Sequence, residues 1–102
     1  MDITVNGACL VLDGEFDGRS TAEVRDALYR LLGDYDGDIV VDLTAVRSVD
    51  LTALRVLAVA TRRAMHEGHR LQLRGCCPAV RRMLHKSRLY RVVDLERAPT
   101  PV

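Results

Sequence analysis

The segment VRSVDLTALRVLAVATRRA (residues 46–64) is the most informative part of the sequence, because it places short polar side chains directly before a long apolar pattern. Apolar residues recur at three- and four-residue spacing, which predicts an amphipathic helix from about Leu51 to Glu67. Asp50 and Thr52 each carry a side-chain oxygen of the kind that caps a helix N-terminus. One of them is expected to be the cap, which leaves the other available for a different role.

The predicted helix has two different faces when successive residues are placed 100° apart. One face gathers the side chains expected in the core: Ala53, Leu54, Leu57, Ala58, Thr61, Ala64 and Met65. The opposite face carries Thr52, Arg55, Val56, Val59, Arg63 and His66. Valines fringed by arginines favour a small apolar patch with a basic rim, which is typical of a protein-binding surface. Isolated surface valines are also common, so a plain solvated face stays open as an alternative.

The Thr52 side chain has two interpretations. Threonine is an ordinary residue in the first turn of a helix. Alternatively, its hydroxyl is presented for modification, because a phosphate there would meet free backbone N–H groups and the positive end of the helix dipole. Such a phosphate would add about −1.5 to −2 charges, which Asp50 would repel. The fold would tolerate this change while the surface chemistry inverted, as a switch requires.

The sequence before this helix alternates between strand and helix patterns. Asn6-Gly7 separates two β-rich apolar runs and predicts a hairpin. Ser20 and Glu23 have the spacing of a capping box, which predicts a helix that ends near Leu32. The next apolar pattern then begins a second series of strands and helices.

That second series contains the predicted core of the sheet. The run DIVVDL (38–43) predicts a strand covered on both faces, followed by TAVRSVD (44–50) as a short connection. After the helix, LQL (71–73) predicts a strand, Pro78 begins a third helix, and YRVVDL (90–95) predicts a last strand. The order ββαβαβαβ indicates an α/β fold, with a mixed sheet formed by an opening hairpin and βα units, and about three helices.

Length and composition limit the possible functions. A chain of 102 residues is one domain, and its formal net charge of +1 provides no general attraction to nucleic acid or to a membrane surface. Cys9, Cys76 and Cys77 do not form a disulfide framework, and no histidine lies at metal-ligand spacing from them, so no metal and no cofactor are expected. No apolar run approaches the roughly 20 residues of a membrane span, and the start lacks a signal-peptide pattern. We therefore expect a soluble cytoplasmic protein.

Two segments together resemble a known family. LDGEFDGRSTAEVRDAL (12–28) is similar to the Gly-Glu-Leu-Asp segment and first helix of STAS domains of anti-sigma-factor antagonists. IVVDLTAVRSVDLTALRVL (39–57) is similar to the strand, turn and Asp-Ser-Ser-Gly-Leu helix opening of the same family. The resemblance covers most of the chain and implies a STAS domain over residues 1–95, with a flexible tail over 96–102.

The resemblance implies a role in bacterial transcription regulation without enzymatic activity. Thr52 matches the family's phosphorylated residue, and Asp50 and Asp17 match acidic residues beside the phosphosite. The implied partner is an anti-sigma factor that is also a serine/threonine kinase, which binds the unphosphorylated domain and releases it after phosphorylating it. Leu51 and Ala53 depart from the family, because they replace a small hydroxyl residue and a glycine. Ala53 adds a methyl group where a kinase must approach.

Other functions stay open to different degrees. STAS domains also serve as permanently docked, unphosphorylated adaptor subunits, for example of membrane transporters, and that role would use the same helix surface. A catalytic thiol at Cys76-Cys77 lacks a histidine base in the sequence, so structural cysteines are expected instead. A basic cluster lies on and after the third predicted helix: Arg81, Arg82, His85, Lys86, Arg88 and Arg91. It is interpreted as a solvated helix C-terminus, because one nearby tyrosine and a near-neutral chain do not favour nucleic-acid binding.

Overall fold

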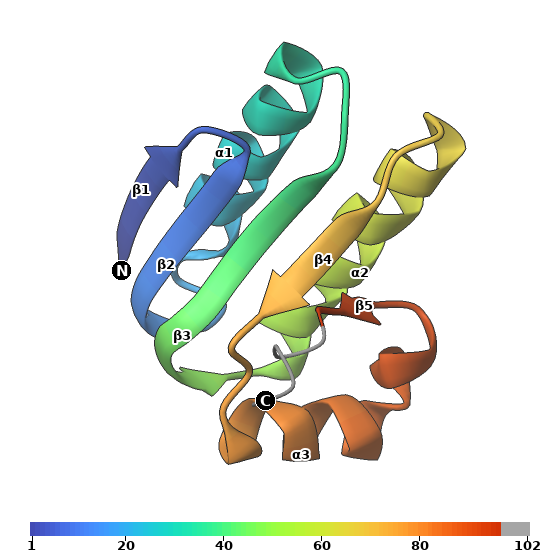
Figure 1. Cartoon of the computed structure of the whole chain (residues 1–102). Helices are drawn as coiled ribbons and strands as arrows, with labels where there is room; N and C mark the ends of the chain where they lie inside the picture. Colours follow the sequence, from blue (N-terminus) through green and yellow to red (C-terminus); the bar gives the residue numbers. More distant parts are fainter. Residues whose placement is uncertain (97–102) are drawn as a thin grey trace, which may run out of the picture.

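The computed structural model describes residues 1–96 and forms a mixed five-stranded sheet with helices packed against it (Figure 1). The elements follow in the order β1 (Asp2–Asn6), β2 (Cys9–Phe16), α1 (Thr21–Asp34), β3 (Ile39–Val49), α2 (Leu51–His66), β4 (Leu71–Arg74), α3 (Pro78–Ser87), the 3-10 turn η1 (Leu89–Arg91) and β5 (Asp94–Leu95). The predicted α/β class, with an opening hairpin followed by βα units, is confirmed. Residues 97–102 of the expected tail lie outside the described residues.

The order of the strands in the sheet is their order in the chain, β1-β2-β3-β4-β5. β1 is antiparallel to β2, and the other three pairs are parallel. Asn6 pairs with Cys9, so Gly7 and Ala8 form the turn between the first two strands. Gly7 has a φ of 61°, a left-handed conformation that glycine adopts without steric cost. The predicted hairpin is therefore confirmed, with its two-residue loop one position later than the predicted Asn6-Gly7.

Strand β3 is longer than the sequence suggested. The prediction of a connection over residues 44–50 is wrong, because β3 continues through Val49, which pairs with Phe16 of β2. The register between the two strands shifts twice, between Val11 and Asp13 and between Gly14 and Glu15 of β2. At each shift β3 contains one extra residue, and such bulges interrupt the alternation by which a strand is identified.

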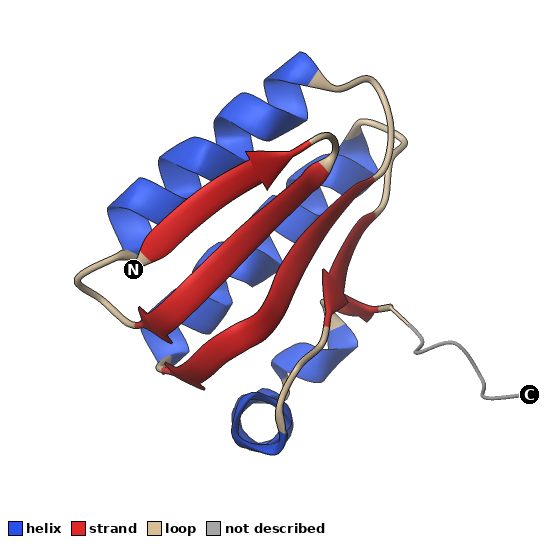
Figure 2. Ribbon diagram, turned by 60° about the vertical axis from the view of Figure 1, so that its left-hand side comes forward, coloured by secondary structure: helices blue, strands red, loops and turns tan. Residues whose placement is uncertain are grey.

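Helices α1 and α2 pack against the same face of the sheet, and α3 lies near one end of it (Figure 2). Side chains such as Leu10, Leu12 and Val41 point to the helices and are buried. Their neighbours in sequence, including Val11 and Val40, are only half-buried. The prediction that residues 38–43 are covered on both faces is thus wrong, because no described helix covers the second face.

Helix α2 buries nearly the face that was predicted. Six of the expected core residues are buried, as is one further alanine: Ala53, Leu54, Leu57, Ala58, Ala60, Thr61 and Ala64. Met65 was also expected in the core, but its side chain is 64% exposed. It lies in the last turn of the helix, where it borders an open hollow with Arg62 and His66.

The predicted capping box at the start of α1 does not form. Ser20 is the residue before the helix, but its side chain makes no capping hydrogen bond. Its buried hydroxyl instead faces backwards, accepting from the N–H of Asp17 at 3.3 Å and lying 3.4 Å from the carbonyl oxygen of Glu15. The serine therefore stabilises the β2–α1 loop.

The C-terminal part differs from the predicted single strand. Pro78 begins α3 as expected. Residues 90–95, however, form part of the turn η1 and then the two-residue strand β5. Glu96 continues the contact with β4, because its N–H donates to the carbonyl oxygen of Leu73 at 2.8 Å and its carboxylate binds Arg74 at 3.0 Å.

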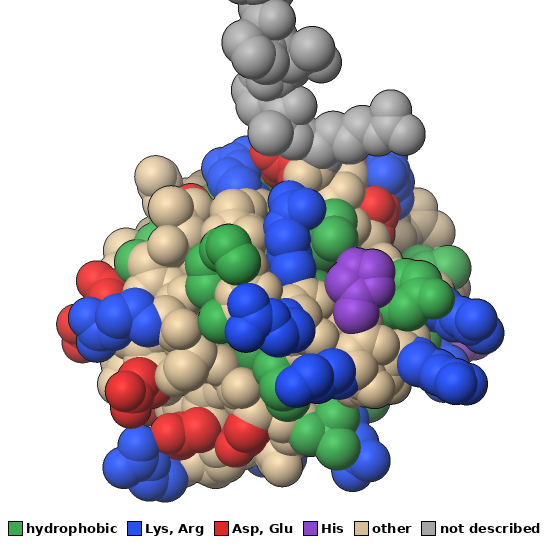
Figure 3. Space-filling view, turned by 90° about the horizontal axis from the view of Figure 1, so that it is seen from below, with side chains coloured by type: hydrophobic (Ala, Val, Ile, Leu, Met, Phe, Trp, Pro, Cys, Tyr) green, Lys and Arg blue, Asp and Glu red, His purple; other side chains and the backbone are tan. Residues whose placement is uncertain are grey.

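Charge is distributed unevenly across the fold. Residues 1–50 contain eleven Asp and Glu against four Arg, whereas residues 51–102 contain eleven Lys and Arg against three Asp and Glu. Because strand order follows chain order, the acidic half lies on the β1 side and the basic half on the β4 side. Figure 3 shows basic and apolar side chains intermixed over most of one face, with a group of acidic side chains at one side. The net charge of +1 therefore conceals two oppositely charged ends.

Candidate functional site

Asp50 is the N-cap of α2. One carboxylate oxygen, Oδ1, accepts a hydrogen bond from the N–H of Ala53 at 2.8 Å, and the other, Oδ2, accepts from the N–H of Gly18 at 2.9 Å. The first bond satisfies a backbone donor that a helix otherwise leaves without a partner. The second ties the β2–α1 loop to the start of α2. Of the two candidate caps, Asp50 has this role.

Thr52 lies one position further along, in the first turn of α2, and its side chain is exposed. No hydrogen bond joins its hydroxyl to any group within residues 1–96. Ala53, which was expected to obstruct a kinase, is fully buried and faces the core. The concern about its methyl group was therefore wrong, and the hydroxyl is open to solvent.

The structure does not join Asp17 to Thr52. Both oxygens of the Asp17 carboxylate are occupied by Arg19, whose guanidinium lies at 2.7 and 3.2 Å and whose backbone N–H lies at 3.0 Å. These hydrogen bonds lower the pKa of the Asp17 carboxyl below its ordinary value. Within the described chain, neither Asp17 nor Asp50 forms a hydrogen bond with the Thr52 hydroxyl. The next residue, Gly18, reaches the start of α2 instead, through its backbone N–H.

Thr52 opens onto a hollow of about 220 Å³ between α1 and α2. Three other residues predicted for partner binding share the hollow with it: Arg55, Val56 and Val59. Arg25 and Tyr29 of α1 form the opposite wall. Three of the four predicted partner-binding residues thus line one hollow with Thr52, without Arg63, and α1 adds an aromatic ring that was not predicted.

A second hollow, of about 230 Å³, lies on the other side of Val59. It is lined by Arg55, Ala58, Val59 and Arg62 of α2, and by Leu89 and Val92 from the η1 region. Because Arg55 and Val59 border both hollows, they form one surface, which we call the α2 trough. The half-exposed Val59 side chain stands between its two parts.

Arg63 lies beside the trough and does not line it. Its guanidinium carbon lies 4.6 Å from the centre of the Tyr29 ring, and its Nε lies 3.7 Å from the Glu67 carboxylate. An arginine over an aromatic face is attracted by the ring's electrons. Arg63 therefore contacts the aromatic wall of the trough, and the partner contact predicted for it stays a prediction.

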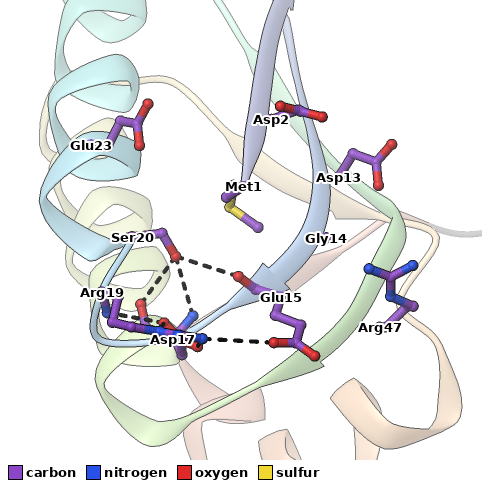
Figure 4. A pocket seen from close by; sticks show the side chains of 10 residues that line it. All are labelled: Met1, Asp2, Asp13, Gly14, Glu15, Asp17, Arg19, Ser20, Glu23 and Arg47. Atoms are coloured by element: carbon purple, nitrogen blue, oxygen red, sulfur yellow. Dashed lines mark hydrogen bonds and ion pairs between the residues drawn. The ribbon is translucent and has the colours of Figure 1, made fainter.

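A wider hollow, of about 680 Å³, lies elsewhere and is mainly acidic (Figure 4). It is lined by Met1, Asp2, Asp13, Gly14, Glu15, Asp17, Arg19, Ser20, Glu23 and Arg47. Its mouth is wide, and the Asp17–Arg19 and Glu15–Arg19 ion pairs occupy one side of it. It contains none of the predicted site residues other than Asp17.

Neither a catalytic thiol nor a metal site is evident within residues 1–96. Burial raises the pKa of the Cys76 thiol above its ordinary value, which keeps the sulfur protonated at neutral pH. The Cys77 sulfur lies 3.6 Å from the carbonyl oxygen of Val46. No three His, Cys, Asp or Glu side chains in this part of the chain are grouped to hold a metal ion. Among these residues, no helix has the length and apolarity to cross a membrane.

Several residues of the trough were missed from sequence. Arg25 and Tyr29 are four positions apart on α1, so they share one flank of that helix, and this spacing was an available signal. Val92 gave no such signal, because residues 90–95 were predicted to be a strand, and Leu89 lies directly before that segment. Arg62 was missed because it lies between the two predicted faces of α2.

The chain is a small α/β domain, and its α2 trough combines apolar side chains with arginines, as protein-binding surfaces do. The family model described as "Mlab, STAS domain" matches residues 1–95, and the chain belongs to this STAS family. The predicted family is thereby confirmed. No protein with curated function matches the sequence.

Solved structures with the same fold include anti-sigma factor antagonists and a sulfate transporter family protein. An anti-sigma factor antagonist from Mycobacterium paratuberculosis has a TM-score of 0.76 at 22% identity, over 94% of this chain and 83% of that one. The unphosphorylated anti-sigma factor antagonist SpoIIAA has a TM-score of 0.69 at 16% identity, over 96% and 88%. A sulfate transporter family protein from Wolinella succinogenes has a TM-score of 0.67 at 17% identity, over 86% and 73%. At these identities the likeness concerns the fold alone.

Proposed function

We propose that this STAS domain is an anti-sigma-factor antagonist that docks an anti-sigma factor kinase through the α2 trough and is released when Thr52 is phosphorylated. The observation that carries the proposal is the position of the Thr52 hydroxyl. It is exposed, it has no partner within the described residues, and it borders the apolar hollow at the start of α2. A kinase docked on the trough would therefore have the acceptor oxygen inside its interface.

The transfer needs little chemistry from this chain. The hydroxyl oxygen of Thr52 would attack the γ-phosphorus of ATP, forming a phosphate ester while the bond to the β-phosphate oxygen breaks and ADP leaves. Asp50 is engaged by two N–H groups and Asp17 by Arg19. We infer that the kinase supplies the base that takes the hydroxyl proton. The contribution of this domain is to position the oxygen.

The phosphate would also reverse the character of the trough. It would carry about −1.5 to −2 charges and lie among the first N–H groups of α2, where the helix dipole favours an anion. Arg25 and Arg55 line the same hollow and would be drawn to it. The phosphate would then neutralise the arginines that a partner would otherwise bind, and it would fill the hollow beside Thr52. A partner would lose both the cationic rim and the space in the hollow, so release follows.

The test is incubation with ATP and the anti-sigma factor kinases of the same host, followed by intact mass spectrometry. The expected result is one added phosphate on the wild type and on Thr4→Ala, an exposed control threonine on β1, but none on Thr52→Ala. Addition of phosphate to Thr52→Ala, or to no variant despite stable binding, would contradict the proposal.

A second candidate is a permanently docked adaptor subunit, for example of a transporter. It is favoured by the length of the trough, which extends beyond Thr52 to Leu89 and Val92, and a relative in fold is a sulfate transporter family protein. Under this alternative, the protein purified from its host would carry no phosphate under any growth condition and would co-purify with a transporter subunit at fixed stoichiometry.

A further inference from the structure

The α2 trough combines two apolar hollows with one ridge between them. Tyr29, Val56 and Val59 provide the apolar surface of the first hollow. Ala58, Val59, Leu89 and Val92 provide that of the second hollow. The Val59 side chain is 53% exposed, so an apolar ridge separates two sockets that can each receive a side chain.

The rim of this trough carries positive charge that the protein does not neutralise itself. The three acidic residues between 51 and 96 each bind an arginine, in the pairs Arg63–Glu67, Arg70–Asp94 and Arg74–Glu96. The other basic side chains of this half have no carboxylate within 4.0 Å among the described residues: Arg55, Arg62, Arg81, Arg82, Lys86, Arg88 and Arg91. All seven lie on α2, α3 or η1 or directly beside them, and Arg55 and Arg62 line the trough itself.

We propose that the occupant of the trough is an acidic amphipathic α-helix of the partner protein. Two of its apolar side chains would enter the sockets on either side of Val59, and Asp or Glu residues beside them would face Arg55 and Arg62. This inference rests on the proposal that the α2 surface is the docking surface, but it does not depend on phosphorylation of Thr52.

An acidic helix fits the paired sockets and the basic rim better than single-stranded nucleic acid or an anionic membrane does. Side chains three or four residues apart on a helix are about 5–6 Å apart, which suits two adjacent sockets separated by a single valine. Acidic residues beside the apolar ones would supply the carboxylates that the basic half lacks. Single-stranded nucleic acid prefers a series of aromatic side chains for base stacking, and the trough contains only Tyr29. An anionic membrane surface would not select paired sockets.

The experiment is selection of a displayed library of helical peptides, with randomised surface positions, against the folded whole chain. The expected peptides carry apolar residues at a spacing of three or four, flanked by Asp or Glu. We expect their affinity to fall at least tenfold for the double variant Arg55→Glu/Arg62→Glu and at least fivefold for Val59→Ser. Arg30→Glu and Val5→Ser are matched controls, because both residues border a hollow between β1 and α1, outside the trough. Their affinities should stay within twofold of the wild type.

Four outcomes would overturn the inference. The first two concern the selection: no peptide is enriched, or the enriched peptides lack acidic residues. The third is equal peptide binding by the trough variants and the control variants. The fourth is that the protein binds anionic lipid vesicles or single-stranded DNA more tightly than the selected peptides. Kinase modification of Thr52 and peptide binding to the trough are separate measurements, so failure of the proposed function can be told from failure of this inference. If the host kinase phosphorylates Thr52 and binds Arg55→Glu/Arg62→Glu normally, the function stands and this inference is wrong. If the selected peptides bind the trough but no kinase modifies Thr52, the inference stands and the switch is wrong.

Discussion

The Asp50 carboxylate and the Gly18 N–H, 32 residues apart in sequence, are joined by a hydrogen bond of 2.9 Å. Because the same carboxylate caps α2 through the N–H of Ala53, one side chain fixes both the start of the helix and the loop before α1. The helix turn that presents Thr52 is therefore held from two directions. This contact explains why an acid stands two positions before Thr52 without requiring it to act on the hydroxyl.

Asp50→Ala is expected to lower the free energy of unfolding by about 1–2 kcal/mol, because the cap and the loop contact are both lost. Asp50→Asn should cost less, since asparagine is also a good N-cap. The measurement is urea denaturation followed by circular dichroism. Asp26→Ala on α1, which loses only an exposed ion pair with Arg25 at 3.7 Å, should change stability by less than about 0.5 kcal/mol. Equal stability of Asp50→Ala and wild type would refute the dual role.

Gly75→Ala is expected to destabilise the fold by about 2 kcal/mol or more. Gly75 has a φ of 72°, and a Cβ atom at this position would lie 3.1 Å from the Cα atom of Thr44 and would overlap the Thr44 hydroxyl. Gly33→Ala, in the last turns of α1 with nothing within 4 Å of the new methyl group, should instead stabilise by up to about 1 kcal/mol. Thermal unfolding of both variants measures the contrast, and a Gly75→Ala variant as stable as Gly33→Ala would contradict it.

Asp17 is expected to contribute to stability on the acid side. Arg19 holds the pKa of the folded Asp17 carboxyl below its ordinary value of 3.8. The contribution is therefore complete above pH 3.8 and is lost as the pH falls through the lower folded value. The stability difference between wild type and Asp17→Asn should shrink below that pH, as measured by urea denaturation at several pH values. A difference that stays constant down to the lowest accessible pH would show that the charge of Asp17 is not involved.

Thr52→Glu is expected to separate stability from binding. A carboxylate in the first turn of α2 is favoured by the helix dipole, so the free energy of unfolding should be unchanged or higher by up to about 1 kcal/mol. Affinity for the kinase partner should nevertheless fall at least tenfold, because negative charge enters the hollow beside Arg55. Calorimetric titration of the partner measures the loss, with Thr52→Ser as the control that keeps the hydroxyl. A loss of stability parallel to the loss of binding would indicate misfolding instead.

The sequence predicted the elements whose local signals agreed with their environment. The opening hairpin and the start of α3 at Pro78 form as expected, and of the two candidate caps of α2 the structure selects Asp50. The length of β3 was not predicted, because two bulges remove the alternation beyond Asp42. The capping box failed because the Ser20 hydroxyl has alternative partners in its own loop, which spacing alone does not reveal.

Only the part of the candidate site that lies on α2 was predicted from the sequence. Thr52, Arg55, Val56 and Val59 share one helix face, so helical periodicity was sufficient to group them. The walls from α1 and from the η1 region depend on how separate elements pack, and periodicity contains no such information. Total charge was also misleading, since a sum of +1 does not show that the acids and bases occupy opposite sides of the sheet.

The identity of strand order and chain order has a consequence for how the protein forms. Each strand after β1 pairs with the one made immediately before it, so each new strand can add to the edge of the sheet already formed. Only the β1–β2 hairpin closes a short loop; each parallel pair closes across a segment that contains a helix, so its pairing is expected to be slower. As the chain leaves the ribosome, the sheet can grow one strand at a time, and β1 to β3 with α1 can assemble before the basic half has been synthesised.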